Sequence, residues 1–93
     1  MITLEEKIGI AAKLIRKSME LKESAGHDVF VEWFPHVDCI SIRAVIGPWD
    51  KTKTVKDFTL KFYQESSVQG TYKEIMDYLN NMEKTSESEA QNG

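Results

Sequence analysis

The apolar positions near the start of the chain recur with the spacing of a helix. The pattern predicts a helix over residues 4–24. Thr3 and Glu6 have the spacing of a capping box, and Gly26 favours a C-terminal stop. The apolar residues form two neighbouring stripes, Leu4, Ile8, Ala11, Ala12, Ile15 and Met19 on one, and Ile10, Leu14 and Leu21 on the other. Because one sheet covers only a single stripe, we expect this helix to pack against a second element as well.

Three strand-like runs follow, at 28–34, 37–46 and 55–64. Only Pro35 and His36 separate the first two runs, which predicts a tight hairpin, although Pro-His is not a favoured turn pair. A two-residue loop sets the register and brings the apolar side chains of both strands onto one face. It places Trp33 opposite Asp38, Val31 opposite Ile40 and Val29 opposite Ile42, and in the third run Phe58, Leu60 and Phe62 face the same way.

A second helix is expected to begin near Thr71, since Thr71 and Glu74 repeat the capping-box spacing. Its apolar stripe contains Tyr72, Ile75, Met76, Leu79 and Met82. The order α-β-β-β-α predicts an α+β fold in two layers, an antiparallel three-stranded sheet with both helices on one face. Residues 1–83 are expected to form this single domain. Residues 84–93 have no large apolar side chain, and we expect a disordered acidic and polar tail that folding does not need.

The balance of acidic and basic residues limits the kinds of partner that the chain can bind. The chain carries 12 Lys and Arg against 15 Asp and Glu, a net charge of -3, which argues against binding duplex nucleic acid through phosphate neutralisation. No apolar run approaches the roughly 18–20 residues of a membrane span, so no membrane interaction is expected. A single cysteine excludes an intrachain disulfide and favours a reducing, cytoplasmic location.

Residues capable of chemistry are few. His27, His36, Asp38 and Cys39 are the only cluster that resembles metal ligands, and the predicted hairpin does not bring them together. Nothing in the pattern places a base beside Cys39, and the carboxylates are scattered over strands and loops. We therefore expect no catalytic residues, no metal and no cofactor, and a protein that is not an enzyme.

The outward face of the sheet is the informative feature. If Val29, Val31 and Trp33 face the helices, aromatic side chains of the first strand must point away, with Phe30 opposite Ser41 and Phe34 opposite Val37. Val45 is expected on the same exposed face. The candidate binding residues are Phe30, Phe34, Arg43, Lys61 and Tyr63. Aromatic and arginine side chains are favoured interface anchors. The alternative is that the loop 47–54 or the tail covers this face.

These observations predict a small accessory or inhibitory module that binds a protein, and a second copy of the chain is one candidate for that protein. Chains of this kind are similar in style to accessory proteins that phages and mobile elements encode. Single-stranded nucleic acid, stacked on the same aromatic and basic face, is the alternative partner. It ranks second because Arg43 and Lys61 are few in an acidic chain.

The element order is also similar to that of double-stranded RNA-binding domains. The resemblance would imply a lysine-rich start to the second helix, where those domains approach phosphates. Here Lys73 is the only basic residue, and it stands beside the acidic Glu74 and Asp77. The likeness therefore stops at the order of the elements.

Overall fold

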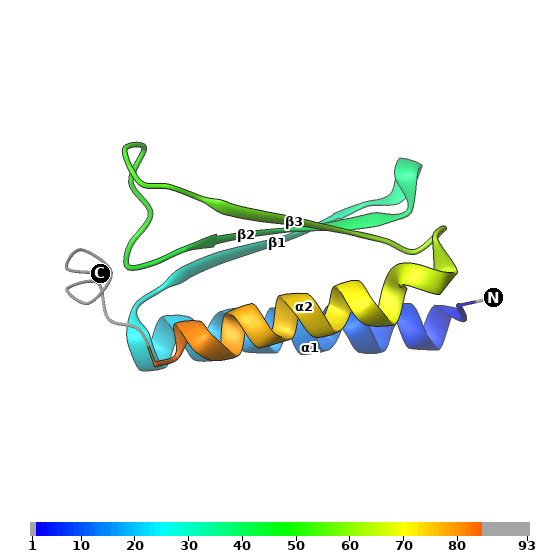
Figure 1. Cartoon of the computed structure of the whole chain (residues 1–93), viewed down its shortest axis with the longest axis horizontal. Coiled ribbons are helices and arrows are strands. Elements are labelled where there is room, and N and C mark those ends of the chain that lie inside the picture. The colour runs from blue at the N-terminus through cyan, green and yellow to red at the C-terminus, as the bar shows by residue number, and fades with distance from the viewer. Residues whose placement is uncertain (1, 85–93) are drawn as a thin grey trace.

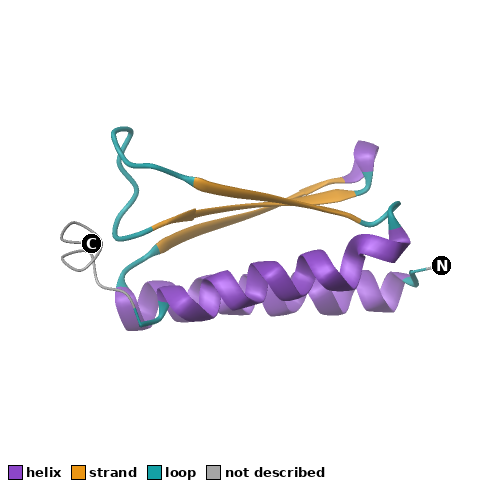
Figure 2. Cartoon of the chain, in the orientation of Figure 1, coloured by secondary structure: helices purple, strands orange, loops and turns teal. Residues whose placement is uncertain are grey.

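The computed structural model of the chain describes residues 2–84. Both helices lie against one face of an antiparallel sheet with the strand order β1-β2-β3 (Figures 1 and 2). The elements are α1 (Leu4–Ala25), β1 (Asp28–Phe34), the short 3-10 turn η1 (Pro35–Val37), β2 (Cys39–Val45), β3 (Lys56–Lys61) and α2 (Glu65–Met82). This arrangement confirms the predicted two-layer α+β fold. Of the predicted tail, residues 85–93 lie outside the described part of the chain.

The ends of α1 follow the local sequence. The backbone N–H of Glu6 donates to Thr3 Oγ1 at 3.1 Å, and the Glu6 side chain accepts from the backbone N–H of Thr3 at 3.5 Å. Gly26 ends the helix in the left-handed conformation, with φ of 73°. The predicted capping box and glycine stop are both confirmed, because each depends on residues within one or two turns.

The two apolar stripes of α1 have different surroundings. Ile10, Leu14 and Leu21 are buried in the core, whereas four large residues of the other stripe are exposed: Leu4 (68%), Ile8 (52%), Ile15 (44%) and Met19 (64%). The expectation that α1 packs against a second element besides the sheet is confirmed, because α1 contacts α2 as well as β1, but neither element covers this second stripe. The helix α2 lies on another side of α1, where the buried Lys17 of α1 pairs with Glu83 at the end of α2. Lys17 and Leu4 project about 140° apart on a helix, so α2 cannot reach the exposed stripe.

The hairpin between β1 and β2 has the predicted faces but a different register. Trp33 lies opposite Ile40, Val31 opposite Ile42 and Val29 opposite Ala44, a shift of two residues from the predicted pairing. The predicted two-residue turn fails because the favoured hairpin turns need a positive φ, which Pro35 cannot adopt. The chain instead makes the turn η1 and takes its positive φ (52°) at Asp38. An even shift keeps every side chain on its predicted face.

The helix α2 begins at Glu65 rather than near Thr71, so its prediction was one and a half turns short. Gln64 precedes the helix without a side-chain capping bond, and the Glu65 side chain accepts from the backbone N–H of Ile2 at 2.9 Å. The added turns bury Val68, which supplies apolar contact that local capping signals do not reveal. Within the predicted stripe Ile75, Leu79 and Met82 are buried, and Tyr72 and Met76 are half-buried.

Neither helix of the described region is long and apolar enough to cross a membrane.

Candidate functional site

Three rows of side chains cross the outer face of the sheet, the face that points away from the helices. The first row, near the loop between β2 and β3, is Phe30, Arg43 and Asp57. The middle row is polar and contains Glu32, Ser41 and Thr59. The third row, near the hairpin turn, is Phe34, Cys39 and Lys61. The prediction that Phe30 and Phe34 lie opposite Ser41 and Val37 was therefore wrong, because of the same two-residue shift.

The five predicted binding residues do not form one cluster. Phe30 lies directly opposite Arg43, and Phe34 and Lys61 flank Cys39 on either side. Phe30 and Phe34 are four positions apart in β1, which corresponds to about 13 Å along a strand. Tyr63 is exposed but lies beyond the end of β3, in the turn before α2. The structure thus divides the predicted surface into a loop end and a hairpin end.

The loop end contains a hollow of about 350 Å³, which we call the loop-end hollow. It is lined by Phe30, Glu32, Arg43, Val45, Trp49 and Val55. The rings of Phe30 (42% exposed) and Trp49 (55%) remain open to solvent, but Val45 is fully buried. The expectation that Val45 is exposed was wrong, because the loop after β2 rises over this end of the sheet (Figure 1). The loop covers part of the face, and its own Trp49 and Val55 line the hollow.

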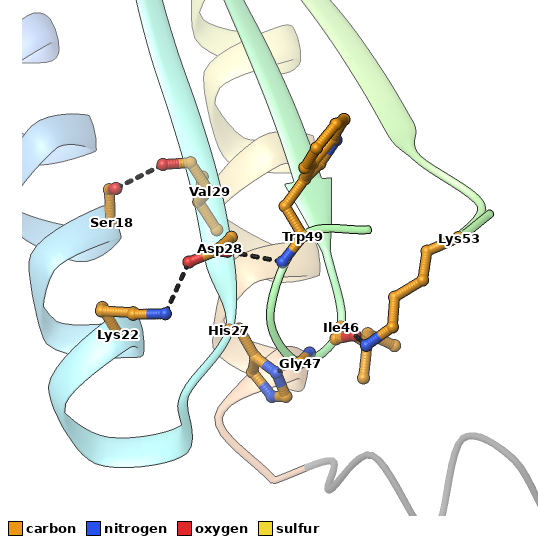
Figure 3. Close-up of polar contacts among 9 residues, drawn as sticks. All are labelled: Ser18, Lys22, His27, Asp28, Val29, Ile46, Gly47, Trp49 and Lys53. Carbon is orange, nitrogen blue, oxygen red and sulfur yellow. Dashed lines mark hydrogen bonds and ion pairs between the residues drawn. The ribbon is translucent and has the colours of Figure 1, made fainter. Parts of the chain in front are cut away.

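Asp28 positions Trp49. Its carboxylate accepts from the backbone N–H of Trp49 at 2.6 Å and from Lys22 Nζ at 2.8 Å (Figure 3). The backbone N–H of Asp28 donates to the carbonyl of Gly47 at 3.2 Å. The ammonium of Lys22, together with the backbone donor of Trp49, holds the pKa of the Asp28 carboxyl below its ordinary value. The start of β1 is thereby joined both to α1 and to the loop that carries Trp49.

We expect Asp28→Asn to lower the free energy of unfolding at neutral pH by about 1 kcal/mol, because a charge-assisted hydrogen bond to Lys22 is lost. The lowered pKa means that this contribution is complete above the unfolded value, near pH 4. It is lost as the pH falls through the lower folded value. Urea unfolding of both proteins at pH 7 and in acid measures the difference. An equal difference at both pH values would contradict the assignment.

His27 anchors the other side of the same loop. The side chain is fully buried, and the backbone N–H of Gly47 donates to its Nδ1 at 2.8 Å. Nδ1 is therefore unprotonated, so Nε2 carries the hydrogen and donates to the carbonyl of Met82 at 2.9 Å. Lys53 Nζ also reaches the carbonyl of Ile46 at 3.1 Å, and Figure 3 shows these groups together at the base of the loop. One imidazole thus links the end of α1 to the loop and to the end of α2.

The hairpin end combines an aromatic ring with polar groups. Phe34 is half-buried, with its ring centre 6.3 Å from that of His36. Cys39 is buried rather than exposed, and its Sγ lies 3.0 Å from the carbonyl of Val37, to which the thiol donates. Asp38 accepts from Lys7 Nζ of α1 at 2.9 Å. The surface at this end therefore presents a half-buried aromatic ring beside a buried thiol and an ion pair.

The charges beside the loop-end hollow are mixed. Arg43 Nε lies 3.3 Å from Asp57 Oδ1, and Glu32 lines the same hollow. Two carboxylates thus accompany the one guanidinium. Two basic residues in the middle of α1 are likewise paired with acidic ones, because the buried Lys17 pairs with Glu83 and Arg16 lies 3.4 Å from Glu20. Neither surface has the excess of positive charge that phosphate groups attract.

The residues that resemble metal ligands in the sequence do not form a metal site in the described part of the chain. Both ring nitrogens of His27 are hydrogen-bonded to the backbone, and the Cys39 thiol donates to a carbonyl. In the part of the chain from residue 2 to 84, no three His, Cys, Asp or Glu side chains are placed to hold a metal ion.

Sequence reasoning missed three residues of the candidate site. Trp49 was assigned only to a covering loop, Val55 only to the start of the third strand-like run, and Asp28 only to the start of the first. The exposed tryptophan within Gly47-Pro48-Trp49 was the available signal, since a large aromatic side chain in a polar loop is uncommon without a contact. Comparison of the chain with protein-family models, curated proteins and solved structures finds no significant match.

Proposed function

We propose that this chain is a non-enzymatic module that binds another protein through the outer face of its sheet, with the loop-end hollow at the centre of the contact. The hollow carries the proposal, because it combines the exposed rings of Phe30 and Trp49 with the guanidinium of Arg43. Tryptophan, arginine and other aromatic residues that surround a depression are the usual anchors of protein interfaces.

The lining indicates what the partner presents. An apolar side chain of the partner would enter between Phe30 and Trp49 and cover the half-buried Val55. Arg43 and Glu32 would face polar groups at the edge of the contact. A module of this size that occupies a partner's surface can act by blocking or bridging it, which is the accessory or inhibitory role that we propose.

Single-stranded nucleic acid is the alternative, because unpaired bases can stack on exposed aromatic rings. The ion pair of Arg43 with Asp57 and the presence of Glu32 in the hollow favour the protein partner. The salt dependence of binding separates the two. Binding to nucleic acid weakens steeply as salt is raised, whereas an apolar protein contact does not.

We expect Trp49→Ala to weaken partner binding by about 1–3 kcal/mol while the melting temperature stays within a few degrees of the wild type, because an exposed ring contributes little to the core. The measurement begins with affinity capture from the native host, followed by titration of the purified partner. Phe30→Ala should have an effect in the same direction. Trp33→Ala is the matched control, since Trp33 is an equally exposed tryptophan (51%) on the helix side of the sheet.

A partner that binds Trp49→Ala and Phe30→Ala as tightly as the wild type would refute the loop-end hollow as the contact. If only Phe34→Ala or Tyr63→Ala abolished binding of the partner, the contact would lie at the hairpin end instead. Capture of nucleic acid with a steep salt dependence would favour the alternative function.

A further inference from the structure

The large residues of the exposed stripe of α1 belong neither to the core nor to the proposed sheet site, and only Ala11 of this stripe packs partly against the core. These large residues are Leu4, Ile8, Ile15 and Met19, all more than two-fifths exposed, and Ala11 and Ala12 lie between them. We propose that this stripe packs, antiparallel, against the same stripe of a second copy of the chain. The partner is identified by the symmetry of the stripe itself.

Large and small side chains are arranged symmetrically along the stripe. About a centre between Ala11 and Ala12, Ile8 mirrors Ile15 and Leu4 mirrors Met19. In an antiparallel pair related by a twofold axis, each residue meets its mirror position on the other copy. Large side chains would therefore meet large ones at both ends. The two alanines would meet at the centre, where small residues let helices approach closely.

The charges beside the stripe are also complementary to a second copy. Glu5 and Arg16 project from the same flank of α1, within about 20° of each other on the helical wheel. In the antiparallel pair, the same flanks of the two helices adjoin, and Glu5 of one copy lies about 3 Å along the axis from Arg16 of the other. Twofold symmetry produces this opposite-charge pair twice. In a parallel pair the same flanks would lie on opposite sides of the contact and Glu5 would be about 16 Å along the axis from Arg16 of the other copy, so this ion pair would not form.

The same charges argue against a membrane surface as the occupant. Helices that lie on membranes combine an apolar face with a polar face rich in Lys and Arg. Here the polar side of α1 carries both signs, with Glu5, Glu6, Glu20 and Glu23 beside Lys13 and Arg16.

The geometry of the fold leaves room for the second copy. The stripe projects away from Lys17, the residue of α1 that pairs with Glu83 at the end of α2. The helix α1 lies on the opposite side of the sheet from the outer face (Figure 2). A dimer through α1 would therefore leave both loop-end hollows accessible. It does not depend on the proposed function, although two hollows on one dimer would bind a repeated partner more tightly than one.

Sedimentation velocity of the full chain over a roughly hundredfold concentration range tests the proposal, and a contact along one helix predicts a dimer of about micromolar affinity. Ile8→Glu and Ile15→Glu should each weaken the dimer more than about tenfold, with circular dichroism and melting temperature unchanged because both side chains are exposed. Phe30→Glu, an exposed residue on the other layer, is the control and should leave the dimer intact. A monomer at every concentration, or a dimer that survives Ile8→Glu, would overturn the proposal.

Cysteine cross-linking tests the orientation. In the antiparallel pair, residue 12 of one copy lies next to residue 12 of the other, near the twofold axis. Mild oxidation of Ala12→Cys should therefore give a covalent dimer. Met19→Cys is the matched control, because the two copies of residue 19 would be about 22 Å apart. The natural Cys39 is buried and should not compete. Cross-linking of Met19→Cys as fast as Ala12→Cys would show a parallel pair and refute the antiparallel arrangement.

Discussion

Leu60→Ala should lower the free energy of unfolding by about 2–5 kcal/mol, and Ile42→Ala should do the same. Both side chains are fully buried on the helix-facing side of the sheet, in β3 and in the central strand β2. Truncation to alanine removes apolar contacts and leaves a cavity that the packed surroundings fill only in part. Small domains have a total stability of about 5–15 kcal/mol, so either change removes a large share of it.

Equilibrium unfolding in urea measures this loss. Thr59→Ala is the matched control, because Thr59 is exposed on β3, next to Leu60 in sequence, and points to the opposite face. We expect the control to change stability by less than about 0.5 kcal/mol. Near-native stability of both core variants would mean that the core lies on the other side of the sheet.

His27→Ala should destabilise the protein by about 2–4 kcal/mol, through the cavity left by a fully buried ring and the loss of its two hydrogen bonds. The backbone N–H of Gly47 and the carbonyl of Met82 would lose their partner in a buried position. The effect should exceed that of an ordinary surface change because the imidazole joins segments that are distant in sequence. Thermal and urea unfolding measure the loss.

His36→Ala is the control for this prediction, since His36 is exposed in the turn η1. Hydrogen exchange supplies a second readout. The Gly47 amide should exchange faster in His27→Ala than in the wild type, beyond the change that global stability explains. Unchanged stability together with unchanged exchange at Gly47 would refute the anchoring role of His27.

The features of this protein that depend on neighbours in sequence were predictable from the sequence. The capping box of Thr3 and Glu6 and the stop at Gly26 involve residues within two turns of one helix. The alternation of side chains between the two faces of each strand is equally local, because it follows from the two-residue period of a strand. The two-layer arrangement then follows, since the apolar sides of helices and sheet must cover one another.

The turns were less predictable. The apolar pattern fits more than one strand register, and the geometry of the turn decides which register forms. A shift of two residues leaves every side chain on the same face, so the pattern cannot distinguish the register with Val31 opposite Ile40 from the observed one with Ile42. The start of α2 at Glu65 was missed for a related reason. Its early turns are stabilised by burial of Val68 and lack a side-chain capping bond that would identify their start.

Only the tertiary structure decided which apolar surfaces are covered. Both stripes of α1 consist of apolar residues, so the sequence does not show which one is buried. The packing of α1 beside β1 and α2 buries Leu14 and leaves Ile15 exposed. The loop that follows β2 places Trp49 near Phe30 because His27 and Asp28 hold the loop from the other side. These contacts join residues about 20 positions apart in the chain, and hydrophobic periodicity reports only on residues within one element. The sequence alone therefore determined the layers of the protein, whereas long-range hydrogen bonds and packing decided where its exposed aromatic and aliphatic surfaces lie.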